Sequence, residues 1–410
     1  MADVDVFIAG AGPAGCATAI SLGQFAPELR VGLADAPPRA ELRVGETVPP
    51  PIRTVLRHLG VWERFERDGH CRSYRTLAAW GSAELGSNEL MLHPEQVGWR
   101  LDRERFDVMM VEAAAERVAL RVEARVSGLE RDDEGDGGRW RIACADGSVH
   151  TARFVVDATG RAAAVARLAG LRPLKSDELV GCFVYFEDGD DDCRDGGGSH
   201  DGDVGHGGGD VPELLVETFC DGWWYTAALP SGRRVVACMT DADLARRLGL
   251  AHLQPWLHAL AETEHVSRLV RESRRLGPPR LLPAGSQVVP CESSRPLLAV
   301  GDAASCFDPV SGQGIVKALR SGIFASYAIA DWLLRDDDAG LVRYDDFVQY
   351  EHGAYQRTLR DYYALETRWP DSEFWRRRRG AAPRGQASRS RRSDRDPRPG
   401  DPELLEKAFG

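Results

Sequence analysis

The chain has 410 residues, a net charge of −11 and a hydrophobic fraction of 43%, so it can bury a sizeable core in two or three domains. The acidic balance argues against general nucleic-acid binding. No apolar run approaches the roughly 18 residues that span a bilayer, and no basic segment precedes the N-terminal apolar stretch as it would in a signal peptide. We expect a cytoplasmic protein without a membrane span and without a nucleic-acid partner.

The N-terminal residues predict a βαβ unit. Residues 4–9 are an apolar strand, residues 16–25 form a helix of small side chains, and residues 29–34 are a second strand that closes with Asp35. Between the first strand and the helix lies GAGPAG, a GxGxxG sequence in the position where dinucleotide-binding folds carry it.

The spacing of this turn predicts a role for each glycine. Gly10 allows the tight turn, Gly12 lets the backbone approach a pyrophosphate, and Gly15 lets the helix pack on the strand. The helix N-terminus offers free N–H groups to phosphate, and Asp35 would accept hydrogen bonds from the adenosine ribose. The predicted cofactor contacts of this segment are Gly10, Gly12, Pro13, Ala14, Gly15 and Asp35. Both NAD and FAD fit this evidence.

The middle and the end of the chain contain two segments of biased composition. Residues 187–210 hold nine acidic side chains and abundant glycine, so we predict a disordered acidic loop there. The segment 376–410 begins with a run rich in arginine and predicts a disordered basic tail. Strands are predicted on either side of the acidic loop, at 148–156 and at about 213–219, 223–229 and 233–240.

A second cofactor motif follows a buried strand near the far end of the chain. Asp302 ends the strand sequence AVGD, and GDAASCFDPVSGQG continues into a long predicted helix. Here the chain resembles the glutathione-reductase-type FAD fold of aromatic hydroxylases and flavin-dependent halogenases. In that family the aspartate binds the ribityl chain, and the turn after it opens a helix beside the flavin ring. The resemblance extends to DATGR at 157–161 and implies FAD contacts at Arg43, Arg103, Val126, Asp302, Pro309, Gly312, Gln313, Gly314 and Ile315.

The resemblance implies an α/β fold. It consists of a Rossmann-like FAD-binding domain of the aromatic-hydroxylase type, an inserted antiparallel β-sheet substrate domain and C-terminal helices. We predict the FAD-binding domain over 1–80, 100–175 and 285–335, the substrate domain over 81–99 and 176–284, and the helices over 336–375. The sequence has no second strand–GxGxxG–helix unit, so electrons would come from transient NAD(P)H docking or from a separate flavin reductase.

The segment VGETVPP at 44–50 resembles the stretch that lies along the flavin in tryptophan-halogenase-like flavoproteins, although a rigid turn would have the same composition. Those halogenases carry a lysine eight residues before a tryptophan. Here Trp80 matches the tryptophan, and Arg72 stands at the lysine position. A guanidinium is a poorer nucleophile than an amine, which disfavours lysine-dependent halogenation. Glu46 and Arg72 are candidates for positioning substrate or handling protons, or else members of a structural salt bridge.

The segment GWWYTAALP at 222–230 resembles a block found in a subgroup of halogenase-like monooxygenases. That subgroup includes the flavoproteins that mature tryptophylquinone-cofactor oxidases by acting on a tryptophan of a partner polypeptide. Because strand side chains alternate, Trp223 and Tyr225 should share one face and Trp224 should take the other. The shared face would stack on an aromatic substrate beside the flavin, or both faces would be ordinary core.

Together these observations predict an enzyme. It is an FAD-dependent monooxygenase that hydroxylates an aromatic side chain, with an indole or tryptophan of a partner protein or peptide as substrate. The alternatives are a flavin-dependent halogenase of a small aromatic molecule, an FAD-binding assembly partner and a simple FAD dehydrogenase. We predict no metal site, because the nine cysteines form no CxxC pair and no Cys/His cluster has zinc spacing. The catalytic candidates are Glu46, Arg72, Trp223 and Tyr225.

Overall fold

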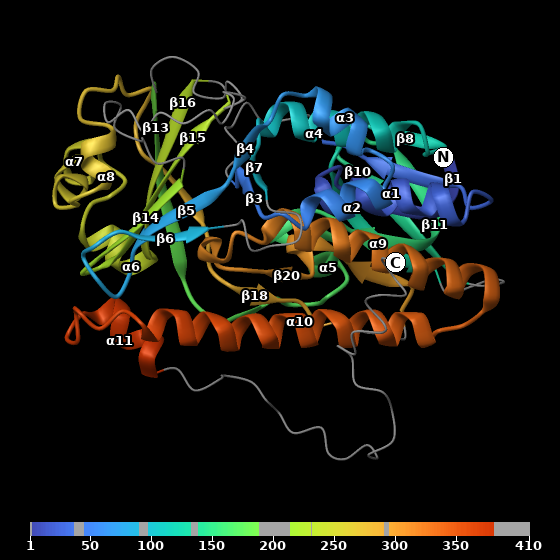
Figure 1. The fold of residues 1–410 in the computed structure, drawn as a ribbon. Coiled ribbons are helices and arrows are strands. Elements are labelled where there is room, and N and C mark those ends of the chain that lie inside the picture. The colour runs from blue at the N-terminus through green and yellow to red at the C-terminus, as the bar shows by residue number, and fades with distance from the viewer. Residues whose placement is uncertain are drawn as a thin grey trace, which may run out of the picture.

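The computed structural model describes residues 2–36, 45–89, 97–132, 138–187, 214–230, 232–290 and 295–380. Arg43, the predicted acidic loop after Glu187 and the predicted tail from residue 381 lie outside these ranges. Figure 1 shows two large sheets side by side, with a long helix running beneath both of them. The α/β fold class is confirmed.

The first large sheet has seven strands: β1 (Ala2–Ala9), β2 (Val31–Ala34), β8 (Leu120–Val122), β9 (Val126–Asp132), β10 (Arg139–Cys144), β11 (Val149–Asp157) and β19 (Leu297–Ala299). The strands β8, β2, β1 and β11 are parallel neighbours in that order, and β19 pairs in parallel with the end of β11. β10 pairs antiparallel with the first part of β11, and β9 pairs antiparallel with β10. The βαβ opening predicted from the sequence is the centre of this sheet.

Two helices bring their N-termini to one side of the first sheet. These are α1 (Pro13–Phe25) and α9 (Gly314–Arg335). A Cβ added at Gly322 would lie 2.5 Å from the Ala14 carbonyl oxygen, so the helices approach closely because a glycine stands at this contact. One side-chain hydrogen bond, 2.7 Å between the hydroxyls of Ser21 and Ser326, joins them further along. The contacts advance together along both helices, so α1 and α9 run in the same direction.

The second large sheet also has seven strands: β5 (Arg75–Ala79), β6 (Gly86–Glu89), β13 (Leu179–Glu187), β14 (Leu214–Phe219), β15 (Gly222–Leu229), β16 (Arg233–Asp241) and β17 (Arg280–Pro283). Their order is β17, β13, β16, β15, β14, β5 and β6, and all pairs except β14–β5 are antiparallel. The predicted domain boundary at residue 80 therefore falls after a strand that pairs within this sheet. One face of the sheet is covered by the short helices α6 (Ala242–Arg247), α7 (Leu253–Ala261) and α8 (Val266–Leu269) (Figure 1).

A small sheet connects the two large ones (Figure 1). Its strands are β3 (Thr47–Val48), β4 (Cys71–Ser73) and β7 (Gly98–Arg100), with β7 in the middle. The guanidinium of Arg100 donates to the carbonyl of Ala228 at 3.3 Å, which ties β7 to the end of β15. Another small sheet joins β12 (Leu174–Lys175), β18 (Gln287–Val288) and β20 (Ser305–Cys306). The remaining helices of the first half are α2 (Ile52–His58), α3 (Trp62–Arg67), α4 (Arg103–Ala115) and α5 (Ala164–Leu168).

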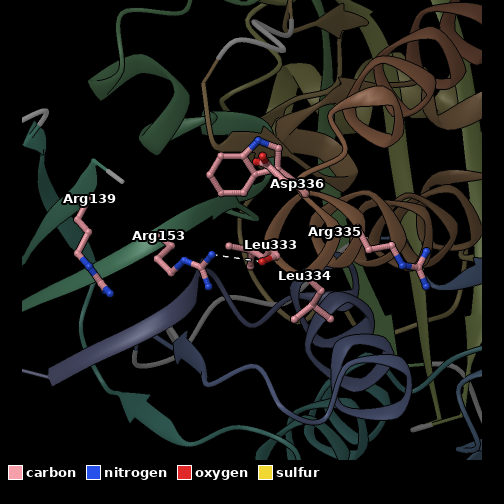
Figure 2. Close-up of a pocket in the computed structure, with 7 residues that line it drawn as sticks. Arg139, Arg153, Leu333, Leu334, Arg335 and Asp336 are labelled. Carbon is pink, nitrogen blue, oxygen red and sulfur yellow. Dashed lines mark hydrogen bonds between the residues drawn. The ribbon is translucent and has the colours of Figure 1, made fainter. Parts of the chain in front are cut away.

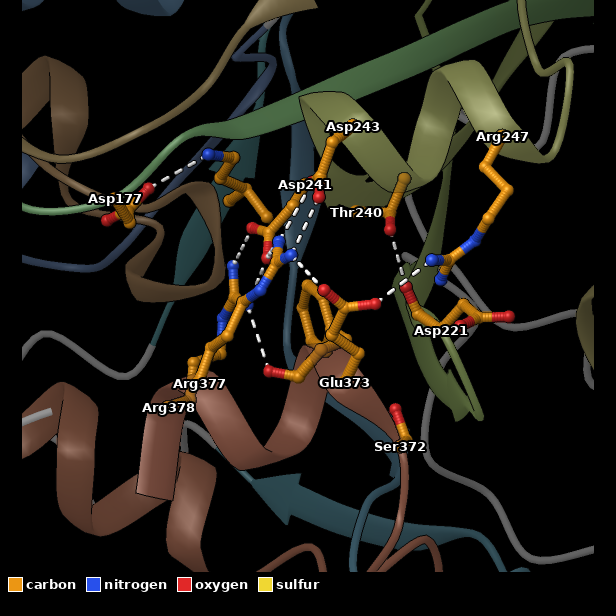
Figure 3. A network of polar contacts seen from close by, with 12 residues as sticks. Asp177, Asp221, Thr240, Asp241, Asp243, Arg247, Ser372, Glu373, Arg377 and Arg378 are labelled. Carbon is orange, nitrogen blue, oxygen red and sulfur yellow. Dashed lines mark hydrogen bonds and ion pairs between the residues drawn. The ribbon is translucent and has the colours of Figure 1, made fainter. Parts of the chain in front are cut away.

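The C-terminal helices span both halves. The helix α10 (Ala339–Ala364) packs on α9, and α11 (Glu373–Gly380) folds back on the second sheet. Figure 3 shows how α11 is held: Arg378 forms a buried ion pair with Asp241 at 2.8 Å, and Arg377 reaches both Asp241 and Asp243. The predicted start of the basic tail at residue 376 is wrong, because these two arginines belong to a folded helix that has carboxylate partners. Within the described ranges, no helix is both long enough and apolar enough to cross a membrane.

Candidate functional site

The first part of the candidate site is the turn between β1 and α1, where two glycines are required by the protein itself. Gly10 has φ 113°, and a Cβ there would lie 2.3 Å from the carbonyl oxygen of Ala158. A Cβ on Gly15 would lie 1.9 Å from the carbonyl oxygen of Gly10. Only glycine has no Cβ to create these clashes, so the strand, the turn and the helix can close on one another.

At two other positions the fold itself does not require a glycine. Gly12, which precedes α1, and Gly314, which begins α9, have no atom within 4 Å of the point where a Cβ would stand, and neither has a left-handed backbone. Both stand at helix N-termini that face the same side, where unpaired N–H groups and the positive helix dipole favour a phosphate or another electron-rich group. Open space above two such backbones suits a bound dinucleotide. The residues present therefore fit FAD.

The residues expected at the adenosine end stand at the end of β2 and at the start of β9 in the first sheet. Asp35 follows β2 and is ion-paired with Arg121 at 3.8 Å. Its backbone N–H donates to the carbonyl of Val122. Val126 begins β9, two strands beyond β11, and is partly buried. Binding of the ribose by Asp35 and of the cofactor by Val126 stays a prediction.

The segment from 301 to 314 lies between the N-termini of α1 and α9. Gly301 has φ 59°, and a Cβ there would meet the Cβ of Ala14 at 2.6 Å, so this segment packs closely on α1. The turn then exposes Pro309, Gln313 and Gly314, while Ile315 is buried behind them. Gly312 has φ 62° and ends the short 3₁₀ turn η4 (Pro309–Ser311).

Asp302 is the acidic residue of this segment. Its carboxylate accepts a hydrogen bond from Lys317 at 2.9 Å. Burial alone would raise the pKa of Asp302, but the charges of Lys317, Arg161 and Arg103 outweigh that effect and hold the pKa below its ordinary value. Asp302 is therefore an anion at neutral pH, as a carboxylate that accepts hydrogen bonds from hydroxyl groups must be.

Glu46 marks the second part of the site, where the loop before β3 meets the second sheet. Its side chain is buried, and the positive charge of Arg103 acts on it, so the catalytic and the salt-bridge interpretations of this residue both stay predictions. Oε1 accepts from the Tyr185 hydroxyl at 3.3 Å, and Oε2 accepts from the Tyr225 hydroxyl at 3.2 Å and from the Gly45 N–H at 2.9 Å. The Arg103 guanidinium, at the start of α4, donates to the Gly45 carbonyl at 3.1 Å and so fixes the loop.

The protonation of Glu46 is set by this environment. Burial raises its pKa, and the nearby positive charge of Arg103 and the hydrogen bonds only partly oppose the rise. The pKa values of Tyr185 and Tyr225 are also raised, by burial first and by the Glu46 carboxylate second, so both phenols stay protonated donors. A carboxyl group whose pKa lies above its ordinary value holds a proton more readily than an exposed glutamate does, which suits a group that transfers protons.

The aromatic strand β15 presents its side chains as its alternation predicts. Trp223 and Tyr225 lie on the face that carries Phe183, whereas Trp224 lies on the opposite face and contacts Trp256. Trp223 is only 1% exposed and is enclosed by other aromatic rings. Tyr225 reaches Glu46, so of the two it is the one that takes part in the polar site.

Arg72 lies apart from this group. Its side chain is exposed on β4, and its guanidinium stands over the ring of Trp99 with 5.8 Å to the ring centroid. In the described part of the chain no hydrogen bond or ion pair joins Arg72 to Glu46. The structure thus brings together Glu46 and Tyr225 among the predicted catalytic residues, and it does not bring Arg72 to them.

The sequence patterns do not reveal two partners of the site: Tyr185, described above, and Asp308. The carboxylate of Asp308 accepts from the Tyr363 hydroxyl at 2.8 Å and from the Val310 N–H at 2.9 Å. Tyr363, on α10, accepts in turn from the indole N–H of Trp223 at 2.9 Å. Burial raises the pKa of Asp308 to about 6. This chain of contacts links β15, α10 and the exposed turn at 309–314.

A surface hollow of about 620 Å³ lies elsewhere, between β10, β11 and the end of α9 (Figure 2). Its arginines are occupied: Arg139 pairs with Asp3, and Arg153 pairs with Asp5 and donates to the Leu333 carbonyl. None of its lining residues belongs to the turns or to the Glu46 group. We therefore assign the hollow no part in the site.

Several known proteins are similar to this chain in sequence or in fold. Residues 5–187 match the lycopene cyclase protein family. A protein of Marinomonas mediterranea named as the FAD-dependent oxidoreductase LodB is 28% identical over 392 residues, which are 92% of this chain and 97% of LodB.

Two solved structures are similar over most of their length. One is the peptidyl tryptophan dihydroxylase QhpG, essential for tryptophylquinone cofactor biogenesis, which is 26% identical, with a TM-score of 0.69 over 92% of this chain and 79% of QhpG. The other is the myxobacterial chondrochloren halogenase CndH, described as a variant of FAD-dependent halogenases. It is 21% identical, with a TM-score of 0.78 over 100% of this chain and 89% of CndH, and so it shows the fold.

Proposed function

This chain is an FAD-dependent oxidoreductase, and we propose that it inserts oxygen into an aromatic side chain, the indole of a tryptophan within a partner polypeptide. The residues proposed to hold FAD are the two helix N-termini at Gly12 and Gly314, the Asp302 carboxylate, and Asp35 at the adenosine end. When bound and reduced, FAD supplies the oxygen-transfer chemistry. The protein supplies binding, orientation and control of protons.

The observation that carries the proposal is the group formed by Glu46, Tyr185 and Tyr225. The glutamate comes from a loop of the FAD-binding half, and the two tyrosines come from β13 and β15 of the other sheet. A carboxyl whose pKa is raised by burial therefore stands where the two halves meet. We propose that Glu46 gives a proton to, or takes one from, the reacting centre, and that the tyrosines orient its carboxyl.

The proposed substrate class follows from chemistry and from the relatives. An electrophilic oxygen attacks electron-rich rings, and indole and phenol rings are nucleophilic at carbon. QhpG, which is similar over 92% of this chain, acts on peptidyl tryptophan. We propose the same class of acceptor here, with a role in maturing a quinone cofactor of the partner. The proposed electron donor is NAD(P)H, docking transiently, or a separate flavin reductase.

The proposal is tested with the FAD-loaded protein, a reductant, oxygen and a peptide that contains tryptophan. A matched peptide with phenylalanine in place of tryptophan serves as the control. We expect the tryptophan peptide alone to gain mass in whole oxygen atoms, and to gain heavy oxygen when isotopically labelled oxygen gas is used.

Three other results would each overturn the proposal in a different way. A product whose mass depends on added chloride or bromide would indicate a halogenase. Maturation of a partner protein that survives in the D302A variant without FAD would indicate an assembly partner. Turnover of an acceptor dye without incorporation of oxygen into any arene would indicate a dehydrogenase.

A further inference from the structure

A buried lysine stands beside the cofactor turn and has no part in the proposed reaction. Lys317 is the fourth residue of α9, and its side chain is only 4% exposed. Lysine is almost never buried to this degree unless its charge is paired. The chain has three lysines in all, so this one stands in an unusual place for a residue type that is rare in the sequence.

The contacts of the Lys317 ammonium go to one short segment. It donates to Asp302 Oδ1 at 2.9 Å and to the backbone carbonyl of Ser305, and it lies 4.7 Å from the centroid of the Phe307 ring. A carboxylate, a carbonyl and an aromatic face together satisfy the three donors of an ammonium group. The lysine therefore fastens the segment 302–307 to the first turn of α9.

The two members of the pair differ in exposure. The side chain of Asp302 is 41% exposed, whereas that of Lys317 is 4% exposed. The ammonium is thus buried, whereas part of the Asp302 side chain remains accessible. Lys317 lies three residues beyond Gly314, which is about 5 Å along a helix axis. Its charge stands within a short distance of the open helix N-terminus.

We propose that Lys317 is a positioning residue of the cofactor site, which fixes Asp302 as an ionised acceptor for the hydroxyl groups of FAD and provides a positive charge that favours reduction of the bound FAD. The proposal rests on the proposed placement of FAD at Asp302 and Gly314. Reduction adds negative charge to the flavin, so a buried cation nearby stabilises the reduced form. The Asp302 carboxylate has the opposite effect, and the pair balances the local charge.

The test uses full-length protein with the variants K317M, D302N and the double variant K317M/D302N. The readouts are the FAD dissociation constant, measured by quenching of flavin fluorescence, and the reduction potential, measured by equilibration with a reference dye. K317M should bind FAD about ten-fold more weakly, because the carboxylate loses a charge-assisted hydrogen bond. K317M should also lower the potential of bound FAD, and D302N should raise it. A purely structural role predicts no such opposite shifts.

The control is R320M. Arg320 lies one turn further along α9 and is paired with Glu351 at 2.9 Å, away from the segment 302–307. It should leave FAD affinity and potential unchanged. If K317M does not fold, the double variant is compared with D302N alone, and removal of the lysine charge should again lower the potential.

The possible failures are distinguishable. Unchanged FAD affinity and potential in both K317M and the double variant would overturn the role of Lys317. Unchanged affinity in D302N would instead overturn the placement of FAD at Asp302. Failure to oxygenate a tryptophan peptide, with all these binding results intact, would overturn only the proposed reaction.

Discussion

The two parts of the site are built in different ways. The cofactor turns present backbone groups: Gly12 and Gly314 leave open space at the N-termini of two helices that run in the same direction. The proton-handling group is made of side chains, with Glu46 held by Tyr185 and Tyr225 from two strands of the other sheet. Damage to the first part should remove FAD from a folded protein. Damage to the second should leave FAD bound and slow the chemistry.

The largest expected effect comes from a pair of alanine substitutions in the first turn. Gly12→Ala should still fold, because nothing lies within 4 Å of the added Cβ and the less favourable residue at the N-cap costs only about 1 kcal/mol. It should nevertheless lose nearly all bound FAD, measured from the flavin absorbance of the purified protein, because the methyl group fills the space proposed for the pyrophosphate.

Gly15→Ala is the counterpart, because its Cβ would lie 1.9 Å from the Gly10 carbonyl oxygen. It should give an unstable or insoluble protein. The same FAD content in G12A as in the unmodified protein would show that the open space above Gly12 does not receive the cofactor.

The next effect is on catalysis. Glu46→Gln keeps the size of the side chain, and its amide oxygen can still accept from one of the two tyrosines while its NH2 group donates to the other hydroxyl, but it cannot exchange a proton. Proton transfer by a positioned group contributes about 10²- to 10⁴-fold. We therefore expect oxygen transfer to fall by at least about 100-fold, while FAD content and the midpoint of thermal unfolding stay close to those of the unmodified protein. Arg72→Gln serves as the matched control, since Arg72 does not contact Glu46, and a comparable loss in R72Q would reverse the assignment of roles.

The difference between the two parts also explains what could be predicted from the sequence. The cofactor turns depend on residues that are adjacent in the chain, so spacing alone predicts that Gly10 is in a tight turn and that Gly15 is at a close helix contact. The partners of Glu46 depend on the register of β13, β16 and β15, which places Tyr185 and Tyr225 on one face. No local pattern contains that information. Tyr185 does stand in an apolar strand before the acidic loop, and a search for buried phenols could have used that signal.

Asp308 and Arg72 show the same limit of local patterns. Asp308 stands inside the recognised motif, but its partner Tyr363 is contributed by a helix far along the chain. The spacing to a tryptophan predicts Arg72 in the site, but spacing in the sequence does not determine the direction of a side chain. In the structure the Arg72 guanidinium is exposed and stands over the ring of Trp99, away from Glu46.

A third prediction concerns Asp308, which joins the cofactor turn to the second half through Tyr363. Burial raises its pKa from 3.8 to about 6, so the folded state prefers the protonated carboxyl. The associated stability is fully present below about pH 4 and is lost as the pH rises through 6. At about 1.4 kcal/mol per pKa unit, the loss amounts to about 3 kcal/mol.

The measurement compares the free energy of unfolding, from urea titrations at several pH values, for the unmodified protein and for Asp308→Asn. Asparagine does not titrate and can still accept from the Val310 N–H. The difference in stability between the two proteins should therefore change across the window between the two pKa values, 3.8 and about 6, in the direction that D308N gains relative stability at higher pH. A difference that is the same from pH 4 to pH 8 would contradict the assigned protonation of Asp308.

The smallest effect should come from Tyr225→Phe. The Tyr225 hydroxyl stabilises the ionised form of Glu46, so its loss should move the pKa of Glu46 further upward. Because Tyr185 and the Gly45 N–H still hold the carboxyl, we expect turnover at the optimum to fall only a few-fold, in keeping with the loss of one hydrogen bond to a charged group. The pH dependence of oxygen transfer should shift its Glu46-dependent limb to higher pH. Tyr185→Phe should act in the same direction through Oε1. In the E46Q background the Glu46-dependent limb is absent, so neither tyrosine substitution should change the pH dependence. A shift that persists without the glutamate would show that the tyrosines act on the substrate directly and not through Glu46.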